Sequence, residues 1–355
     1  MKLSLIIPTY NEKDNIQKLL LELSEEFLKN NIENEIIVVD DNSPDGTGEK
    51  LKELQNKYKD LKIIHRSKKL GLSSAVLEGF VISSGDILGV MDADLSHPVA
   101  KINEMYQLMV GGADLVIGSR YVRGGKIEGW NLYRKILSKG ATLLARVFID
   151  VKDPMSGFFM TKKSVLINTE INSKGFKILL ELLIKTNCKN IAEVPIVFVN
   201  RTAGKSKAGG REIVYFLKNL VGYLPFKRQI ISEFFKFALV GLVGTLINIA
   251  ILYTLTEYLN LYYIFSALCA FVVAVTTNFV FNKIWTFSEG IRERIMREYI
   301  SFFLVSISAL SINILFLYIF TEFLEIYYIV SQILAIGVAL IINFIGNKIW
   351  TFHKK

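Results

Sequence analysis

Cysteine and histidine are scarce in this sequence, which has two cysteines and three histidines in 355 residues. Cys188 and Cys269 lie far apart, and Cys269 falls inside an apolar stretch, so neither a disulfide framework nor a metal-binding cysteine pair is indicated. The histidines lack the close spacing of zinc ligands, which argues against a zinc site. A reduced, cytosolic environment is the resulting expectation for the polar part of the chain.

Glycine-rich phosphate loops of two common kinds are also missing. No G-x-G-x-x-G follows the first apolar run, and no G-x-x-x-x-G-K-[ST] occurs in the chain. These absences argue against a dinucleotide-dependent enzyme and against a P-loop NTPase. The first residues, "MKLSLIIPTYNE", lack the apolar length and the small-residue cleavage site of a signal peptide, so we expect a buried strand there.

Apolar residues are abundant but unevenly distributed, and they make up 51% of the chain. Up to about Gln229 short apolar runs alternate with charged stretches, whereas four long apolar segments follow from about Phe234. We therefore expect a soluble domain over residues 1–229 and a membrane domain over 230–355. The formal net charge of +9 then favours a lipid bilayer and anionic ligands, and not nucleic acid, as partners.

The front domain alternates short apolar runs with helical patterns, which is typical of a parallel α/β sheet. We predict strands at 3–7, 35–39, 61–64, 87–91 and 115–117, and helices near 14–29, 47–58, 71–83 and 98–110. Ligands of such sheets bind at the carboxyl ends of the strands. Here those ends read "PTYNE", "DDNSPDG", "DADLSHP" and "GSRYVRGG", which predicts a site at this edge.

The back domain contains apolar spans near 234–256, 262–281, 299–321 and 326–345, each long enough to cross a membrane as a helix. Residues 252–287 repeat as 317–352 with 20 identities in 36 positions, and both copies end in "NKIWTF". The sequence therefore predicts two copies of a helical hairpin. Asparagines recur inside the spans, and we expect them to hydrogen-bond between helices: Asn248, Asn278, Asn313 and Asn343.

Lysine and arginine flank the spans on one side only. They lie before the first span, between the second and third, and after the fourth, whereas the breaks "TEYLNLYY" and "TEFLEIYY" contain neither. By the positive-inside rule the front domain, the middle loop and the C-terminus are cytoplasmic. The expected protein is an integral, multi-pass membrane protein.

Asp92 and Asp94 follow the fourth predicted strand, one residue apart. On an extended strand end both carboxylates face one side, and two hard oxygen ligands suit Mg²⁺ or Mn²⁺, with further ligands from substrate phosphates. D-x-D alone is a weak signal that also occurs in solvated turns, but its place at a strand end strengthens the metal interpretation. A bound metal would neutralise a diphosphate leaving group.

Polar loops after the first two strands suit a nucleotide. Tyr10 offers a ring face, while Glu12 and Asp41 offer acceptors for ribose hydroxyls or base edges. The residues of "NSPDG" are turn formers in their own right, so Asp45 is a weaker candidate than Asp41.

Together these segments resemble the family 2 glycosyltransferases of GT-A fold, most closely the dolichyl-phosphate mannose synthases. The resembling words, in order, are "IIPTYNE", "VVDDNSPDGT", "GLSSAV", "MDADLSHP", "GSRYVRGG", "YRKILSKGA", "DPMSGFF", "GFKILLELL" and "VPIVFVNRTAGKSK". They span nearly all of residues 1–220, and the back domain resembles the GtrA-like domains attached to some of these enzymes. The resemblance implies an α/β GT-A domain with a Rossmann-like, mostly parallel sheet, followed by four transmembrane helices.

The resemblance also implies roles for individual residues, with Asp92, Asp94 and Arg120 as the catalytic ones. The guanosine end of GDP-mannose would be held by Pro8, Tyr10, Glu12, Val39 and Asp41, and the diphosphate and metal by Asp92, Ala93, Asp94 and Ser96. The lipid phosphate would meet Arg120, Arg134 and Ser138, and the donor phosphates Arg120, Arg201, Ser206 and Lys207. Ser96 stands where some members have a glutamine metal ligand, and Ala203 and Gly209 stand where some have basic residues.

A phosphate acceptor suits a site without an evident general base. A phosphate monoester, with a second pKa of about 6, is already anionic at neutral pH, so positioned arginines suffice. Direct displacement at the anomeric carbon would convert an α-linked donor into a β-linked product. Asp153 of "DPMSGFF" could act as a base or as a turn residue before Pro154.

Two segments, near 131–149 and 211–226, have amphipathic helical patterns. The first carries a basic stripe of Lys135, Lys139 and Arg146 beside an apolar one, and the second repeats apolar residues at helical spacing. Either could pack on a core with a solvated charged face. Their attachment to membrane spans favours helices that lie in the headgroup plane.

The predicted function is therefore transfer of mannose from GDP-mannose to dolichyl or polyprenyl phosphate at the cytoplasmic membrane face. One alternative is the same reaction with another donor, such as UDP-glucose. A second is a flippase or transporter of lipid-linked sugars whose front domain senses nucleotide sugars, and a third is a nucleotide-binding module without catalysis.

Overall fold

The computed structural model describes the chain except for residues 168, 172–177, 201–209, 289–294 and 353–355. The chain divides into two compact units, Met1–Phe226 and Lys227–Lys355. The first is an α/β domain and the second is helical.

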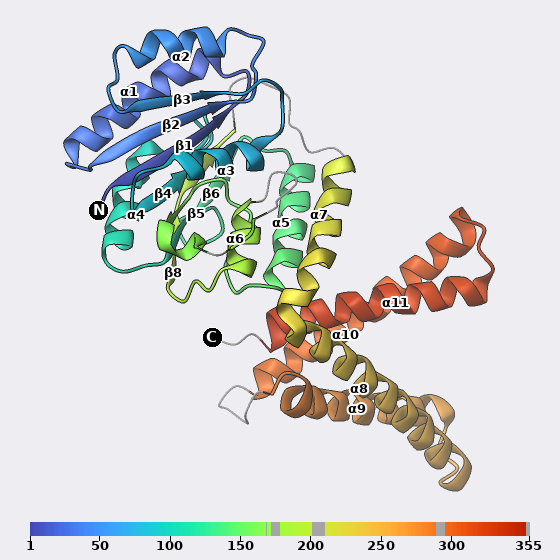
Figure 1. Cartoon of the computed structure of the whole chain (residues 1–355). Helices are drawn as coiled ribbons and strands as arrows, with labels where there is room; N and C mark the ends of the chain where they lie inside the picture. Colours follow the sequence, from blue (N-terminus) through green and yellow to red (C-terminus); the bar gives the residue numbers. More distant parts are fainter. Residues whose placement is uncertain (168, 172–177, 201–209, 289–294, 353–355) are drawn as a thin grey trace. The chain divides into compact units, whose positions relative to one another are not determined.

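A seven-stranded sheet forms the centre of the first unit (Figure 1). Its order is β3-β2-β1-β4-β7-β5-β8, and all neighbours are parallel except the pairs that β7 makes with β4 and β5. The mostly parallel sheet predicted from the sequence is confirmed, but β7 and β8 were not predicted. The strands are β1 (Leu3–Thr9), β2 (Asn34–Asp40), β3 (Leu61–His65), β4 (Ile87–Val90), β5 (Leu115–Ser119), β7 (Phe159–Lys162) and β8 (Ile191–Pro195).

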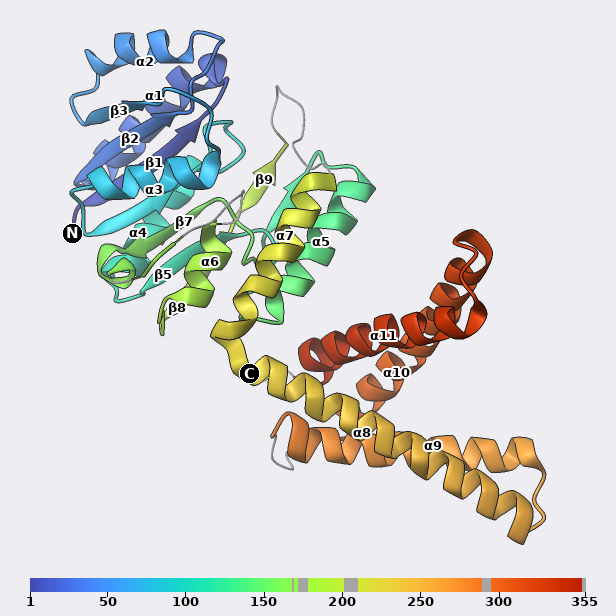
Figure 2. The same cartoon turned by 45° about the vertical axis from the view of Figure 1, so that its right-hand side comes forward.

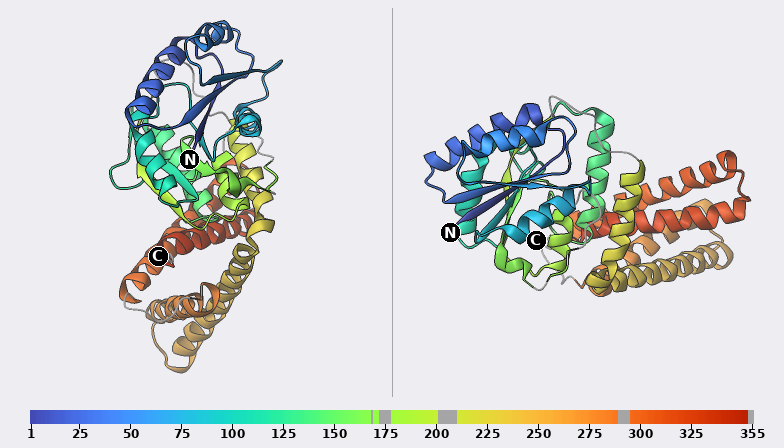
Figure 3. Two further views of the ribbon diagram at one scale, coloured as in Figure 1. Left: turned by 60° about the vertical axis from the view of Figure 1, so that its left-hand side comes forward. Right: turned by 45° about the horizontal axis from the view of Figure 1, so that its top comes forward.

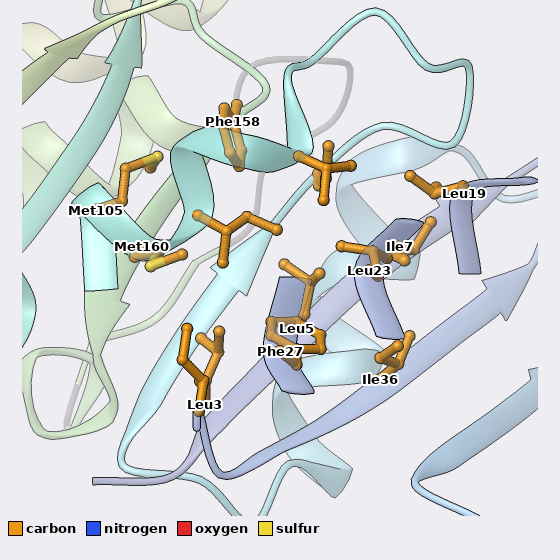
Figure 4. Close-up of a cluster of buried hydrophobic side chains, with 14 of the residues drawn as sticks. Leu3, Leu5, Ile7, Leu19, Leu23, Phe27, Ile36, Met105, Phe158 and Met160 are labelled. Carbon is orange, nitrogen blue, oxygen red and sulfur yellow. The ribbon is translucent and has the colours of Figure 1, made fainter. Parts of the chain in front are cut away.

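Helices cover both faces of this sheet, so that its strands are buried on both sides. In β1, Leu5 and Ile7 point into one core while Ile6 points into the other, as the two-residue period of a strand requires. Figure 4 shows the first of these cores. The helices of the first core are α1 (Lys13–Lys29), α2 (Thr47–Gln55) and α4 (Ile102–Val110), and those of the second are α3 (Leu72–Ile82) and α6 (Ile178–Lys185).

The loops at the carboxyl edge of the sheet bend sharply. Asn11, Asn42 and Leu95 follow β1, β2 and β4 and have positive φ angles of 60°, 60° and 58°. Asparagine tolerates this left-handed conformation, but leucine rarely adopts it, so the turn after β4 is strained. Backbone strain of this kind gathers at functional sites, and here it directly follows Asp94.

A two-stranded ribbon and two helices complete the first unit. The ribbon pairs β6 (Lys126–Glu128) in parallel with β9 (Val197–Val199). Helices α5 (Leu132–Arg146) and α7 (Gly210–Tyr223) lie side by side (Figure 2) and pack with α6 in one apolar cluster. Both also keep exposed apolar side chains: Leu132, Tyr133 and Ile136 on α5, and Tyr215, Leu217 and Val221 on α7.

Helices of the second unit pair into two hairpins, which Figure 3 shows from two directions. The second hairpin begins and ends its returning helix 65 residues after the first (328 − 263 and 346 − 281), so the sequence repeat is also a structural one. The hairpins are α8 (Arg228–Tyr253) with α9 (Tyr263–Phe281), and α10 (Ile295–Tyr318) with α11 (Tyr328–Gly346).

Four helical segments of the described chain are long and apolar enough to cross a membrane, and the first of them starts in α7 and continues through the turn Leu224–Lys227 into α8. Their bounds are Tyr215–Tyr258, Tyr263–Thr286, Ile295–Phe323 and Tyr328–Thr351.

The two hairpins contact each other through equivalent residues. Lys283 at the end of the first hairpin pairs with Glu298 of α10, and Lys348 at the end of the second pairs with Glu233 of α8. Both partners are offset by 65 residues (348 − 283 and 298 − 233), so one ion pair is made twice, in opposite directions. The rings of the equivalent residues Phe287 and Phe352 stack with their centroids 4.7 Å apart.

The asparagines within the spans behave less uniformly than expected. Asn313 accepts a hydrogen bond from Gln332 across the second hairpin at 3.4 Å, as predicted. Asn343 instead accepts one from Asn347 in the same helical segment, at 2.7 Å. Interhelical hydrogen bonding by all four asparagines is thus not what the described residues show.

Candidate active site

Asp92 and Asp94 lie in the turn that follows β4. Asp94 is buried, and its Oδ1 accepts hydrogen bonds from the Ser96 backbone N–H at 3.1 Å and from the Ser96 hydroxyl. Asp92 is more open, with 31% of its side chain exposed. A Cβ on Gly157 would lie 3.0 Å from Asp92 Oδ2, so a larger residue there would press on this carboxylate. The turn therefore fixes one carboxylate and leaves space around the other.

These two carboxylates fit a Mg²⁺ or Mn²⁺ site that a substrate completes. Within the described ranges, no cluster of three or more His, Cys, Asp or Glu side chains could hold a metal by itself. Mg²⁺ is often bound by one or two carboxylates, with substrate phosphates and water as its other ligands. The Ser96 hydroxyl, predicted as a third ligand, is directed to Asp94, so in this structure it orients a carboxylate.

His97 is buried beside these carboxylates and was considered from the sequence only as a zinc ligand. Its ring stacks on Phe158 with centroids 5.2 Å apart, and its Nδ1 accepts the backbone N–H of Asp92 at 3.3 Å. Burial, the largest influence, lowers the pKa of His97 to about 4 although the charge of Asp94 opposes it. A neutral imidazole thus holds the turn that carries Asp92.

Arg120 follows β5 and is held by Asp153. Asp153 Oδ2 accepts from the Arg120 backbone N–H at 3.0 Å and from Nε at 2.7 Å, while Oδ1 accepts from Nη2 at 2.8 Å. Burial works to lower the pKa of Arg120, but the hydrogen bonds and charge of Asp153 outweigh it and raise the pKa. Because both Asp153 oxygens are occupied by Arg120, this carboxylate serves as an anchor, which favours the structural interpretation over a general base.

Aromatic rings link Arg120 to the start of α5. The guanidinium carbon of Arg120 lies 5.4 Å from the ring centroid of Tyr121 and 5.7 Å from that of Trp130, and that of Arg134 lies 4.0 Å from Trp130. The hydroxyl groups of Tyr121 and Ser138 are 2.9 Å apart. The three residues predicted for the lipid phosphate, Arg120, Arg134 and Ser138, are therefore gathered by two aromatic side chains.

The predicted nucleotide residues lie at the ends of β1 and β2. Pro8 and Val39 are paired in the sheet register, and the Asp41 backbone N–H donates to Thr9 at 2.9 Å. The Tyr10 ring carries the ammonium of Lys69 at 3.4 Å from its centroid. This contact brings the loop after β3 into the region predicted for the base.

Asp41 has a different surrounding from the one its sequence position suggested. It is buried, its Oδ1 accepts from Arg66 at 2.9 Å and from the Leu70 N–H at 2.8 Å, and its Oδ2 accepts from the Gly71 N–H at 2.8 Å. Asp41 thus orders the loop that brings Lys69 to Tyr10. Direct contact of Asp41 with a nucleotide stays a prediction.

The remaining predicted residues divide into two groups. Ala93 is buried between the two aspartates, and Glu12 accepts a hydrogen bond from the Asn15 side chain at 2.8 Å. The residues predicted to close over the donor phosphates lie outside the described residues: Arg201, Ser206 and Lys207.

The described site is a carboxylate pair at the carboxyl end of a central strand, with an anchored arginine at the end of a neighbouring strand. The charge of Asp92 contributes to the raised pKa of Arg120, which places the two groups within electrostatic reach of each other. Guanidinium groups attract phosphates, and so would a metal ion bound by the two carboxylates. With membrane-length helices in the same chain, these features are those expected of a membrane-bound enzyme that acts on phosphorylated substrates.

Comparison with known proteins gives the family. Residues 4–170 match glycosyl transferase family 2, and residues 236–352 match the GtrA/DPMS transmembrane domain. A dolichol-phosphate mannosyltransferase of Pyrococcus furiosus is 39% identical over 352 residues, which cover 98% of each chain. The chain belongs to the dolichol-phosphate mannosyltransferase family and is a glycosyltransferase and an integral membrane protein, as the sequence predicted.

Other relatives match a smaller share of the chain. A dolichol-phosphate mannosyltransferase of Saccharomyces cerevisiae is 40% identical over 237 residues, covering 63% of this chain and 87% of that protein. Among solved structures, mannosyl-3-phosphoglycerate synthase from Rubrobacter xylanophilus has a TM-score of 0.49 at 17% identity, covering 63% of this chain and 74% of that one. Glucosyl-3-phosphoglycerate synthase from Mycobacterium tuberculosis, in complex with Mn²⁺ and UDP-glucose, has a TM-score of 0.48 at 18% identity, covering 63% and 78%.

Proposed function

We propose that this glycosyltransferase transfers mannose from GDP-mannose to dolichyl or another polyprenyl phosphate, with inversion and in dependence on Mg²⁺ or Mn²⁺. The observation that carries the proposal is the pair of arginines joined by Trp130, with Arg120 fixed by Asp153 near the β4 carboxylates. The names of the relatives from Pyrococcus furiosus and Saccharomyces cerevisiae support mannose as the sugar and dolichol phosphate as the acceptor.

The acceptor phosphate would bind at Arg120, Arg134 and Ser138. A phosphate monoester is dianionic over much of the neutral range, since its second pKa is about 6. It therefore needs positioning rather than deprotonation, which agrees with a site whose buried carboxylate, Asp153, is fully engaged as an anchor.

The donor diphosphate would lie at the β4 turn. Asp92 and Asp94 would hold the metal, which when bound supplies charge neutralisation for the departing diphosphate. Ser96 keeps Asp94 oriented, and His97 keeps the Asp92 backbone in place. The guanosine end would extend toward Tyr10 and the ends of β1 and β2.

The reaction balances without a proton transfer. An acceptor phosphate oxygen forms a bond to the anomeric carbon of mannose, while the bond from that carbon to the GDP oxygen breaks and GDP leaves with the electron pair. Attack from the side opposite the leaving group inverts the α-linked donor to a β-linked lipid product. Arg120 and Arg134 reduce the cost of bringing two anionic groups together.

The exposed apolar faces of α5 and α7 support a position of the site at the membrane surface. Leu132, Tyr133 and Ile136 are more than 60% exposed on α5, and the same helix carries basic residues. Such a helix is suited to lie in the headgroup plane, where it would present the acceptor phosphate to Arg134 and Ser138. The lysine and arginine pattern around the spans supports a cytoplasmic site.

Mass spectrometry of the lipid product tests this function. The full chain in detergent is incubated with polyprenyl phosphate, Mg²⁺ or Mn²⁺, and either GDP-mannose or UDP-glucose. We expect a mannosylated lipid phosphate from GDP-mannose, loss of product with chelator, and a β linkage by NMR. Turnover of UDP-glucose alone would overturn the donor, and no lipid product from any donor would favour the transporter or binding-module alternatives.

A further inference from the structure

Trp130 carries a buried donor without an acceptor. Its indole Nε1 is inaccessible to solvent and, among the described residues, makes no hydrogen bond. Buried tryptophan N–H groups usually have a partner, and a native exception calls for an explanation such as a ligand that completes it. The missing partner must be an acceptor, because the indole nitrogen can only donate.

The backbone holds Trp130 firmly in this position. Gly129 has a φ of +75°, and a Cβ on it would lie 2.8 Å from the Cβ of Asn200, so only glycine fits. Asn200 donates its N–H to the Glu128 carbonyl at 3.1 Å, and the Asn131 side chain caps α5 by accepting the Arg134 N–H at 2.9 Å. Trp130 is thus fixed between the β6–β9 ribbon and the first turn of α5.

The surroundings of the indole select an anion. The Arg134 guanidinium lies over the ring at 4.0 Å and Arg120 lies at 5.7 Å, while Phe198 contacts the ring edge-on with centroids 5.4 Å apart. Because two cations and an apolar ring surround the indole, a negatively charged oxygen is favoured there over a neutral hydroxyl. A phosphate oxygen satisfies both the N–H group and the positive potential.

We propose that Trp130 Nε1 donates a hydrogen bond to the phosphate of the lipid acceptor, as a binding residue additional to Arg120, Arg134 and Ser138. The proposal rests on the proposed function. Arg120 after β5, Trp130 between β6 and α5, and the α5 residues would together hold the phosphate in one orientation. Such positioning is what attack on the anomeric carbon requires when no general base takes part.

The first test follows the indole N–H in the unmodified full chain. The protein has three tryptophans, so a spectrum of detergent-solubilised protein with ¹⁵N-labelled tryptophan has three indole signals, assigned by single Trp→Phe variants. Farnesyl phosphate should shift the Trp130 proton downfield, whereas farnesol and inorganic phosphate at the same concentration should not. No shift with farnesyl phosphate would overturn the proposal, and an equal shift with inorganic phosphate would overturn the lipid as its source.

The second test separates acceptor from donor binding. Trp130→Phe keeps a ring over Arg134 but removes the N–H, so the KM for polyprenyl phosphate should rise roughly tenfold or more while the KM for GDP-mannose stays unchanged. Trp285→Phe, which alters an exposed membrane-domain ring, is the matched control. A rise confined to the donor KM, or no rise at all, would overturn the proposal. If the unmodified protein makes no product, the proposed function fails, while the NMR response still decides whether Trp130 binds a lipid phosphate.

Discussion

The two units of the chain differ in whether their ion pairs are repeated. At the carboxyl edge of the first unit the pairs are all different: Arg120 with Asp153, and Arg66 with Asp41. In the second unit one pair is made twice, by Lys283 with Glu298 and by Lys348 with Glu233. Duplicated hairpins that pack on each other need equal contacts, whereas an asymmetric substrate needs unequal ones. We therefore expect the first unit to carry the chemistry and the repeated ion pair of the second unit to serve its assembly.

Exposure of apolar side chains separates the units in the same way. The sheet of the first unit is buried between two cores, and α5 and α7 carry six of its exposed apolar side chains, while others, such as Leu28 and Val81, lie on α1 and α3. In the second unit residues such as Leu246, Ile314 and Ile333 are about 60% exposed along the spans, as a lipid environment requires. Helices α5 and α7 of the first unit thus carry several exposed apolar side chains, as the helices of the second do.

The largest expected effect on stability comes from breaking the ion pair between Arg120 and Asp153. Asp153→Asn leaves the buried Arg120 charge without a counter-charge, so the free energy of unfolding of the first unit should fall by about 3–5 kcal/mol. Urea denaturation followed by circular dichroism measures this. Asp60→Asn, at an exposed carboxylate before β3, is the control and should change stability by less than about 0.5 kcal/mol.

A double variant separates stability from function at the same pair. Arg120→Met with Asp153→Leu replaces both charges by apolar groups and should recover most of the lost stability. Transfer should remain abolished, because the acceptor phosphate has lost a guanidinium. Recovery of activity together with stability would show that Arg120 acts only in packing.

The next effect concerns the carboxylate pair. Asp94→Asn keeps an acceptor for Ser96 but removes a charge, and we expect kcat/KM to fall on the order of 10²–10³-fold with little change in stability. Product formation over a range of Mn²⁺ concentrations measures it, with Asp60→Asn as reference. Transfer at the unmodified rate would exclude Asp94 as a metal ligand.

The fold was largely predictable because its long elements carry periodic patterns. The five predicted strands and the helices between them are present, and each contributes apolar residues to one or both cores. The pairing of β6 with β9 and the insertion of β7 were missed, because strands of three or four residues carry too little pattern and are fixed by tertiary partners.

The site was predictable only where chemistry is local in sequence. Asp92 and Asp94 stand one residue apart, so their pairing is visible in the sequence. Trp130 and His97 were missed because their significance depends on Phe198 in β9, which contacts both rings. The contacts of Asp41 with three donors from residues 66–71 were not predicted, because no local sequence pattern shows them.

A smaller effect is expected from the repeated pair in the second unit. Glu233→Lys places two cations together at Lys348 and should lower the stability of the second unit by about 1–3 kcal/mol. Adding Lys348→Glu restores opposite charges and should recover most of the loss. If the hairpins are equivalent, the same exchange at Glu298 and Lys283 should give the same values, and thermal unfolding in detergent measures all of them. Unequal effects would show that the two equivalent ion pairs do not stabilise the second unit equally.

The smallest expected effect on transfer in detergent is that of removing the second unit. Deletion of 230–355 leaves α5, α6 and α7 with their shared cluster of Ala145, Leu180, Leu220 and Tyr223, and it leaves the predicted phosphate-binding residues intact. Detergent already disperses the acceptor, so loss of the membrane anchor should cost only a few-fold in rate, whereas with acceptor in vesicles the loss should be larger because the anchor raises the local lipid concentration. Transfer rates of the full chain and of the deletion protein, measured in detergent and with acceptor in vesicles, give the two losses. A deletion protein that is folded by circular dichroism but inactive in detergent would give the repeated hairpins a direct part in the reaction, and the division between chemistry and assembly would no longer hold.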